Sequence, residues 1–175
     1  HEYELQAELE REFRMHDACP AYNSIIGTGS NACVLHYRDN NRRSGDGELV
    51  LIDAGAEYRG YASDITRTFP VNGRFSTEQR ALHDLVLAAQ AAALEQARPG
   101  IAYEEGHLAA VEVLTEGLLR LGLLKGDLEE NLIERHYQRF YPHKTGHWLG
   151  LDVHDVGDYR VAGESRLLEP GMVFT

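Results

Sequence analysis

The sequence predicts an α+β domain in which helices cover one side of a mainly antiparallel sheet. After one opening helix come strand-like segments, helical segments follow, and strand-like segments return near the end. This grouping favours an antiparallel sheet, because a parallel sheet is typical of chains in which strands and helices alternate. A chain of 175 residues is also long enough to bury one core without disulfides.

The chain opens with a predicted amphipathic helix over residues 2–17. Leu5, Leu9 and Phe13 recur at every fourth position among charged residues, which places them in one apolar stripe. Pro20 cannot continue a helix, so we expect the helix to stop there.

A strand, a turn and a second strand are predicted next. Ile25 and Ile26 begin a short strand, Gly27 and Gly29 mark a turn, and residues 34–37 have the composition of another strand. A polar loop follows, and residues 48–69 then form two strand-like runs joined by a plausible turn.

The middle of the chain is helical. Ser76 stands three residues before Gln79, as in a capping box, and apolar positions continue through Leu94. We predict further helices over residues 103–121 and 127–135. Strand-like runs broken by glycines return from Tyr141 onward.

The net charge limits the binding partners that we expect, and the cysteine content indicates the cellular compartment. A net charge of -11 argues against nucleic acid or an anionic membrane surface as a partner. Cys19 and Cys33 form no CxxC pair or disulfide framework, so we expect a cytoplasmic protein. We find neither a signal peptide nor an apolar run long enough to cross a membrane.

Two aspartates define the most informative part of the sequence. Asp53 and Asp64 lie on either side of the predicted turn, at the spacing of a β-hairpin. If Arg59-Gly60 is the two-residue loop, Asp53 faces Thr66 and Asp64 is its diagonal neighbour; a turn one residue earlier puts the aspartates directly opposite. Two carboxylates so close need a proton or a cation between them, and we favour a metal site.

Three histidines lie close together in the segment 142–155. His147 and His154 are an odd number of residues apart, so one regular strand would send them to opposite faces unless the backbone bends near Gly150. A histidine added to two aspartates suits manganese, cobalt, iron or zinc. Two such ions can share a hydroxide and polarise a substrate carbonyl, which is hydrolytic chemistry.

These motifs resemble the Xaa-Pro aminopeptidases (aminopeptidase P), within the prolidase and creatinase group. The resemblance covers essentially the whole chain and is carried by residues 53–70, 147–155 and 168–173 in that order. It implies the pita-bread fold and two divalent metal ions, for which we expect Mn²⁺. It also implies hydrolysis of peptides with proline second, by attack of a hydroxide that bridges the metals.

The resemblance assigns a role to six residues. Asp53 would bind one ion, Asp64 would bridge both, and His147 would bind the other. His154 would contact the substrate and stabilise the tetrahedral intermediate. His36 would lie near the scissile carbonyl, and His143 would line the proline pocket. Lys144 departs from the glycine that many relatives have there.

The remaining two ligands of that group are glutamates that these 175 residues do not contain. We therefore expect one incomplete catalytic-type domain over residues 1–175, truncated at its C-terminal end and lacking the N-terminal domain of the parent protein. By itself it should bind metal weakly and lack useful peptidase activity. The parent protein is expected to form homo-oligomers, as many relatives do.

Other functions remain open. A prolidase that cuts only Xaa-Pro dipeptides, or a methionine aminopeptidase, would use the same fold. A catalytically silent peptide-binding module is the alternative of another class.

Overall fold

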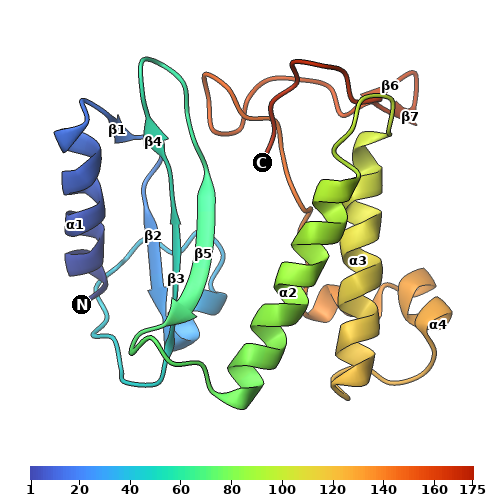
Figure 1. Ribbon diagram of the computed structural model, residues 1–175, viewed down its shortest axis with the longest axis horizontal. Helices are drawn as coiled ribbons and strands as arrows, with labels where there is room; N and C mark the ends of the chain where they lie inside the picture. The colour runs from blue at the N-terminus through green and yellow to red at the C-terminus, as the bar shows by residue number, and fades with distance from the viewer. The chain divides into compact units, whose positions relative to one another are not determined.

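The computed structural model describes residues 1–175, which form two compact units (Figure 1). The first unit comprises His1–Gln79, Trp148–Val156 and Val173–Thr175. The second comprises Arg80–His147 and Gly157–Met172. Each unit is described separately.

The first unit is built on a three-stranded antiparallel sheet in the order β2-β3-β5. Its elements are α1 (Glu2–Met15), β1 (Cys19–Pro20), β2 (Ile25–Thr28), the 3-10 helix η1 (Gly29–Cys33), β3 (Leu49–Ala54), β4 (Ala56–Glu57) and β5 (Ile65–Pro70). Helix α1 lies against β2, and β1 pairs with β4 to extend the hairpin (Figure 1). Ile26 and Val50 are buried between these elements.

The hairpin has the first of the two predicted registers. Asp53 pairs with Thr66, and Tyr58 pairs with Tyr61 at the tip. Arg59 and Gly60 form the two-residue loop, with φ values of 51° and 85°. Positive φ at both positions matches the twist of the flanking strands, which is why glycine is favoured in such a loop.

The C-terminal residues of the first unit are held to its loop over residues 148–156, which contains His154. Trp148 forms a β-bridge with Phe174, and their rings meet edge to face at 6.0 Å. Trp148 is buried. Its packing against Phe174 therefore fixes the start of this loop.

The second unit is mainly helical. It contains most of α2 (Thr77–Glu95), with α3 (Tyr103–Arg120), α4 (Leu128–Ile133), the 3-10 helix η2 (His136–Arg139), and a small antiparallel pair, β6 (Arg160–Val161) and β7 (Glu164–Ser165). Its core joins Leu85 and Ala89 of α2 to Leu114 and Leu118 of α3. None of the protein's helices is long and apolar enough to span a lipid bilayer.

The predicted helices are confirmed, as is the capping box before α2. Ser76 Oγ accepts from the Gln79 backbone N–H at 3.2 Å, while the Gln79 side chain accepts from the Ser76 N–H at 2.9 Å. The first helix ends earlier than expected, however. Asp17 has a left-handed backbone (φ 57°), so the chain leaves the helix before Pro20 is reached.

Two strand predictions were wrong. Residues 34–37 form no strand, because His36 adopts φ 54° and Tyr37 turns inward to hydrogen-bond Glu2. From Tyr141 onward only β6, β7 and isolated bridges occur. Turns stabilised by side chains replace the expected ladder there.

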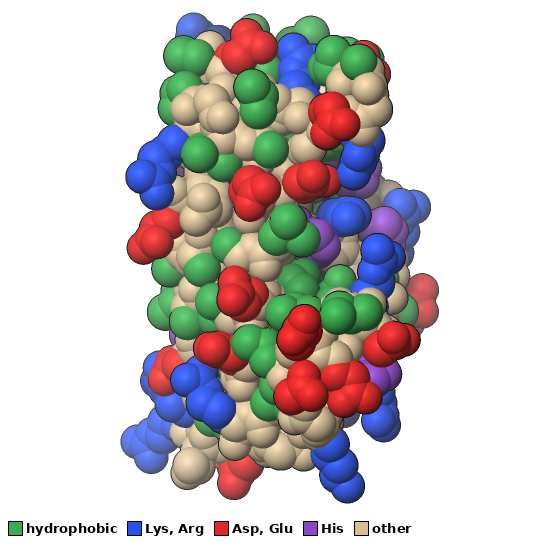
Figure 2. Space-filling model, turned by 90° about the vertical axis from the view of Figure 1, so that its right-hand side faces the viewer, with side chains coloured by type: hydrophobic (Ala, Val, Ile, Leu, Met, Phe, Trp, Pro, Cys, Tyr) green, Lys and Arg blue, Asp and Glu red, His purple; other side chains and the backbone are tan.

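Figure 2 shows one face of the protein in space-filling form. Acidic, basic and hydrophobic side chains are mixed on this face, with histidines among them. The net charge of -11 is therefore not gathered into one acidic patch on the face shown.

Candidate metal centre

The two aspartates lie together on the sheet of the first unit. Asp53 is on β3, and Asp64 immediately precedes β5, where it lies diagonally across from Asp53. Both side chains are half-buried. The hairpin therefore brings two carboxylates to one place, as its spacing predicted.

Tyr22 joins the two carboxylates. Its hydroxyl lies 2.5 Å from Asp53 Oδ1 and 3.0 Å from Asp64 Oδ1. A phenol has a single proton to donate, so it fully satisfies only one carboxylate oxygen at a time. The two acidic oxygens lie within about 6 Å of each other, close enough for strong repulsion when both are ionised.

The electrostatics agree with this crowding. Burial raises the pKa of Asp53, the Tyr22 hydrogen bond opposes that change, and the charge of Asp64 raises the pKa further. Burial and the same hydrogen-bonded carboxylates raise the pKa of Tyr22, so its hydroxyl stays protonated. A divalent cation would offset the repulsion between the carboxylates.

Gly55 fixes the spacing of the hairpin beside Asp64. In the observed register it stands opposite Asp64, and a Cβ at this position would overlap the carbonyl group of Ser63. The backbone of Ala21 donates to Gly55 O at 2.9 Å from the other side. Only a residue without a side chain allows these backbones to pack so closely.

The loop that contains His154 is attached to the same hairpin. The Ala62 N–H donates to Gly150 O at 2.8 Å, two residues before Asp64. Within the loop, Asp155 donates its N–H to Trp148 O, and its carboxylate packs where a Gly150 side chain would be. Gly150 therefore permits the predicted bend. His154 itself is exposed.

His36 belongs to the first unit, on the exposed loop that follows η1. His143 and His147 belong to the second unit. The roles that the resemblance assigns to these histidines stay predictions.

His143 belongs to a small polar cluster of the second unit. Its ring meets Tyr141 edge to face at 4.8 Å, and the Tyr141 hydroxyl lies 2.8 Å from Thr145 Oγ1. His107 Nδ1 lies 2.9 Å from the same threonine hydroxyl. Burial, and then the charge of Lys144, lower the pKa of His107. Sequence patterns did not single out His107, because its partners lie far along the chain.

Tyr22 was also missed, and no local signal points to it. Its two partners are 31 and 42 residues away, so neither periodicity nor motif spacing links them. The register between β2 and β3 is the signal that could have revealed Tyr22. Ile25 pairs with Asp53, which places the residues just before β2 beside the aspartates.

The donor set suits a hard divalent cation in part. Asp53 and Asp64 offer carboxylate oxygens, the kind of ligand that Mn²⁺ and Mg²⁺ favour. The structure contains no group of three or more His, Cys, Asp or Glu side chains arranged to hold a metal. Within the first unit, Asp53 and Asp64 are the two carboxylates that could contribute to a metal site.

Comparison with known proteins identifies the class. Residues 1–175 match metallopeptidase family M24, and the chain belongs to this family.

Its named relatives are more specific. The chain is 51% identical to a Haemophilus influenzae Xaa-Pro aminopeptidase and 50% identical to that of Escherichia coli, in both cases over 99% of this chain and 40% of the relative. It is also 41% identical to the mitochondrial intermediate cleaving peptidase 55 of Arabidopsis thaliana, over 98% of this chain and 33% of that protein. The chain thus spans about two-fifths of the bacterial relatives' length.

Solved structures agree. Pseudomonas aeruginosa aminopeptidase PepP matches with a TM-score of 0.98 and 59% identity, over 99% of this chain and 39% of that one. Zinc-substituted E. coli aminopeptidase P in complex with product matches with a TM-score of 0.95 and 50% identity, over the same shares. The α+β fold class and its assignment to the aminopeptidase P fold are confirmed.

Proposed function

We propose that the protein containing this chain is a metal-dependent aminopeptidase that removes the first residue of a peptide when proline is second. The observation that carries the proposal is the pair Asp53 and Asp64 around one tyrosine hydroxyl, in a chain about half identical to Xaa-Pro aminopeptidases. Proline gives the reaction a distinct substrate, because its tertiary amide lacks the N–H that many peptidases require.

Asp53 and Asp64 would hold divalent cations, with His147 as a further ligand. Bound cations supply a nucleophile at neutral pH and polarise the peptide carbonyl. The Tyr22 hydroxyl lies within hydrogen-bond distance of both carboxylates and donates to one of them at a time, which would help to orient both aspartates. His36, His143 and His154, which are all exposed, would contact the peptide.

His154 would donate a hydrogen bond to the carbonyl oxygen as that oxygen gains negative charge. The bond from Ala62 to Gly150 keeps its loop on the aspartate hairpin. His36 would lie beside the scissile bond, and His143 would pack against the proline ring, a role suited to its contact with Tyr141.

Manganese is the metal we propose, in a cytoplasmic protein that assembles as a homo-oligomer. Carboxylates with imidazole suit Mn²⁺, and the two cysteines are free thiols. With three of the group's five ligands, this chain by itself should bind the ions weakly.

The test is hydrolysis by the whole protein loaded with Mn²⁺. Release of the first residue from Ala-Pro-Ala, with little from Ala-Ala-Ala, supports the proposal. Asp53→Asn should abolish the activity together with tight Mn²⁺ binding. A wild-type protein that binds Mn²⁺ and leaves Ala-Pro-Ala intact would refute it.

Two further substrates separate the related functions. Preference for the dipeptide Ala-Pro would indicate a prolidase, and release of methionine from Met-Ala-Ser would indicate a methionine aminopeptidase. Binding of Ala-Pro-Ala without cleavage would favour the silent peptide-binding module.

A further inference from the structure

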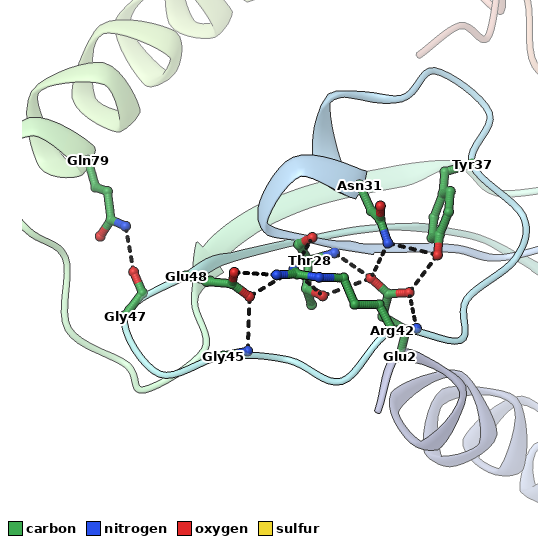
Figure 3. A network of polar contacts seen from close by, with 9 residues as sticks. All are labelled: Glu2, Thr28, Asn31, Tyr37, Arg42, Gly45, Gly47, Glu48 and Gln79. Carbon is green, nitrogen blue, oxygen red and sulfur yellow. Dashed lines mark hydrogen bonds and ion pairs between the residues drawn. The ribbon is translucent and has the colours of Figure 1, made fainter.

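Glu2 is a buried carboxylate that lies outside the aspartate pair. It stands at the start of α1 and is 0% exposed. Oε1 accepts from Thr28 N at 2.8 Å, Thr28 Oγ1 at 2.7 Å and Asn31 Nδ2 at 3.2 Å. Oε2 accepts from Tyr37 Oη at 2.8 Å and Arg42 N at 2.9 Å (Figure 3). Five donors therefore converge on one side chain.

No cation pairs directly with this carboxylate. The Arg42 guanidinium instead donates to Glu48, at 2.6 and 2.9 Å, and to Thr28 O (Figure 3). Burial would raise the pKa of Glu2, but the hydrogen bonds from Thr28, Arg42 and Tyr37 outweigh it and the pKa is lowered. An ionised carboxylate only accepts hydrogen bonds, and this one is satisfied entirely by neutral donors.

The two oxygens of Glu2 hold the two ends of one loop. Oε1 binds Thr28 and Asn31 where the loop begins, and Oε2 binds Tyr37 and Arg42 where it ends. Asn31 Nδ2 also donates to Tyr37 Oη at 2.8 Å, which closes the base of the loop.

His36 lies within this loop, next to one of its anchors. Tyr37 is buried with its hydroxyl on Glu2, whereas Val34 and Leu35 are 53% and 65% exposed and His36 is exposed as well. His36 has a left-handed backbone (φ 54°), which is unfavourable for a residue that has a side chain. Such a conformation persists only where the surrounding contacts impose it.

We propose that Glu2 is a positioning residue for substrate binding: by clamping both ends of the loop over residues 28–42, it fixes the place of His36. The inference rests on the proposed function, because it takes His36 to be the residue that meets the peptide. Glu2 touches no substrate and acts through the loop.

Glu2→Gln tests the clamp with almost no change in size. The glutamine amide nitrogen would take the place of one of the two acceptor oxygens. In one orientation of the amide it would face the N–H of Thr28, and in the flipped orientation it would face the N–H of Arg42. A backbone N–H cannot become an acceptor. One end of the loop must therefore be released. Glu48→Gln is the matched control, because it weakens the Arg42 contact of the same network without touching Glu2, Tyr37 or His36.

The first measurement is hydrogen exchange in the whole protein. We expect backbone amides of residues 33–38 to exchange about ten- to a hundredfold faster in Glu2→Gln, which is the effect of losing buried hydrogen bonds. They should exchange within about twofold of wild type in Glu48→Gln. Unchanged exchange in Glu2→Gln would overturn the proposal.

The second measurement is a double-mutant cycle on kcat/KM for Ala-Pro-Ala. Glu2→Gln should lower kcat/KM about tenfold when His36 is present, as expected for a displaced contact residue. In the His36→Ala background it should lower kcat/KM less than about twofold, because coupled residues are not additive. Equal losses in both backgrounds would show general destabilisation and overturn the proposal.

The proposed function can fail separately. A wild-type protein that does not hydrolyse Ala-Pro-Ala overturns that function, and hydrogen exchange alone then decides whether Glu2 holds the loop. If Glu2→Gln does not fold, Tyr37→Phe replaces it. That variant removes one donor on the His36 side and leaves the backbone donors intact, so it should speed exchange over residues 33–38, and wild-type exchange there would overturn the clamp.

Discussion

Replacing Gly55 with alanine should disrupt the hairpin that positions the aspartates. The added Cβ would overlap the Ser63 carbonyl group and lie 3.0 Å from Asp64 N. These are backbone atoms of the paired strand, so no side-chain rotation relieves the contact. The strands must move apart by more than an ångström.

The loss in free energy of unfolding can be estimated from the overpacking and from the hydrogen bonds that would weaken when the strands separate. Overpacking a tight site costs about 1–3 kcal/mol. The bonds from Ser63 N to Ala56 O, at 3.0 Å, and from Ala21 N to Gly55 O, at 2.9 Å, flank the site and would weaken. Each is worth about 1 kcal/mol net. We therefore expect Gly55→Ala to lower the free energy of unfolding by about 3–5 kcal/mol.

The assay is urea unfolding of the whole protein, with Mn²⁺ binding measured by calorimetry. Mn²⁺ affinity should fall together with stability, because Asp64 is displaced. Gly106→Ala is the control: it lies within α3, and its Cβ would meet only Ala93 O at an ordinary 3.5 Å. That change should be neutral or stabilise by up to about 1 kcal/mol. A Gly55→Ala protein with wild-type unfolding and Mn²⁺ affinity would refute the reasoning.

Three further predictions concern the charged groups. Tyr22→Phe removes the proton shared by the aspartates and should weaken Mn²⁺ binding about ten- to a hundredfold; unchanged affinity by calorimetry would contradict it. Because burial, and also the charge of Asp64, raise the pKa of Asp53, the metal-free protein should lose stability as pH rises through that pKa. Asp64→Asn should reduce this loss and abolish stabilisation by Mn²⁺, as thermal scans with and without EDTA would show. Burial and Lys144 lower the pKa of His107, so the folded state binds fewer protons than the unfolded state and stability falls as pH drops below about 6.5. Lys144→Gly should raise that pKa, and an unchanged NMR titration of His107 would exclude the effect.

The correct predictions rest on interactions between neighbours in sequence. The Asp53 and Asp64 hairpin depends on a two-residue turn and a period of two. The cap at Ser76 and Gln79 joins residues three positions apart. Such short-range contacts can be predicted from the sequence, because the residues that contact each other belong to the same sequence pattern.

The wrong strand at residues 34–37 and the missed residue Tyr22 have a common cause. Residues 34–37 have the composition of a strand, but Tyr37 is drawn to Glu2, 35 residues away. The bonds of Tyr22 to the aspartates span similar distances along the chain. Propensity is a weak preference, and buried polar contacts override it.

By itself, the sequence determined the fold class, the hairpin register as one of two alternatives, and the family resemblance that the comparisons support. Only the tertiary structure showed that Tyr22 holds both aspartates and that Glu2 holds the His36 loop. The physical reason is that a buried carboxylate must collect its donors wherever the fold brings them, and those donors are far apart in sequence.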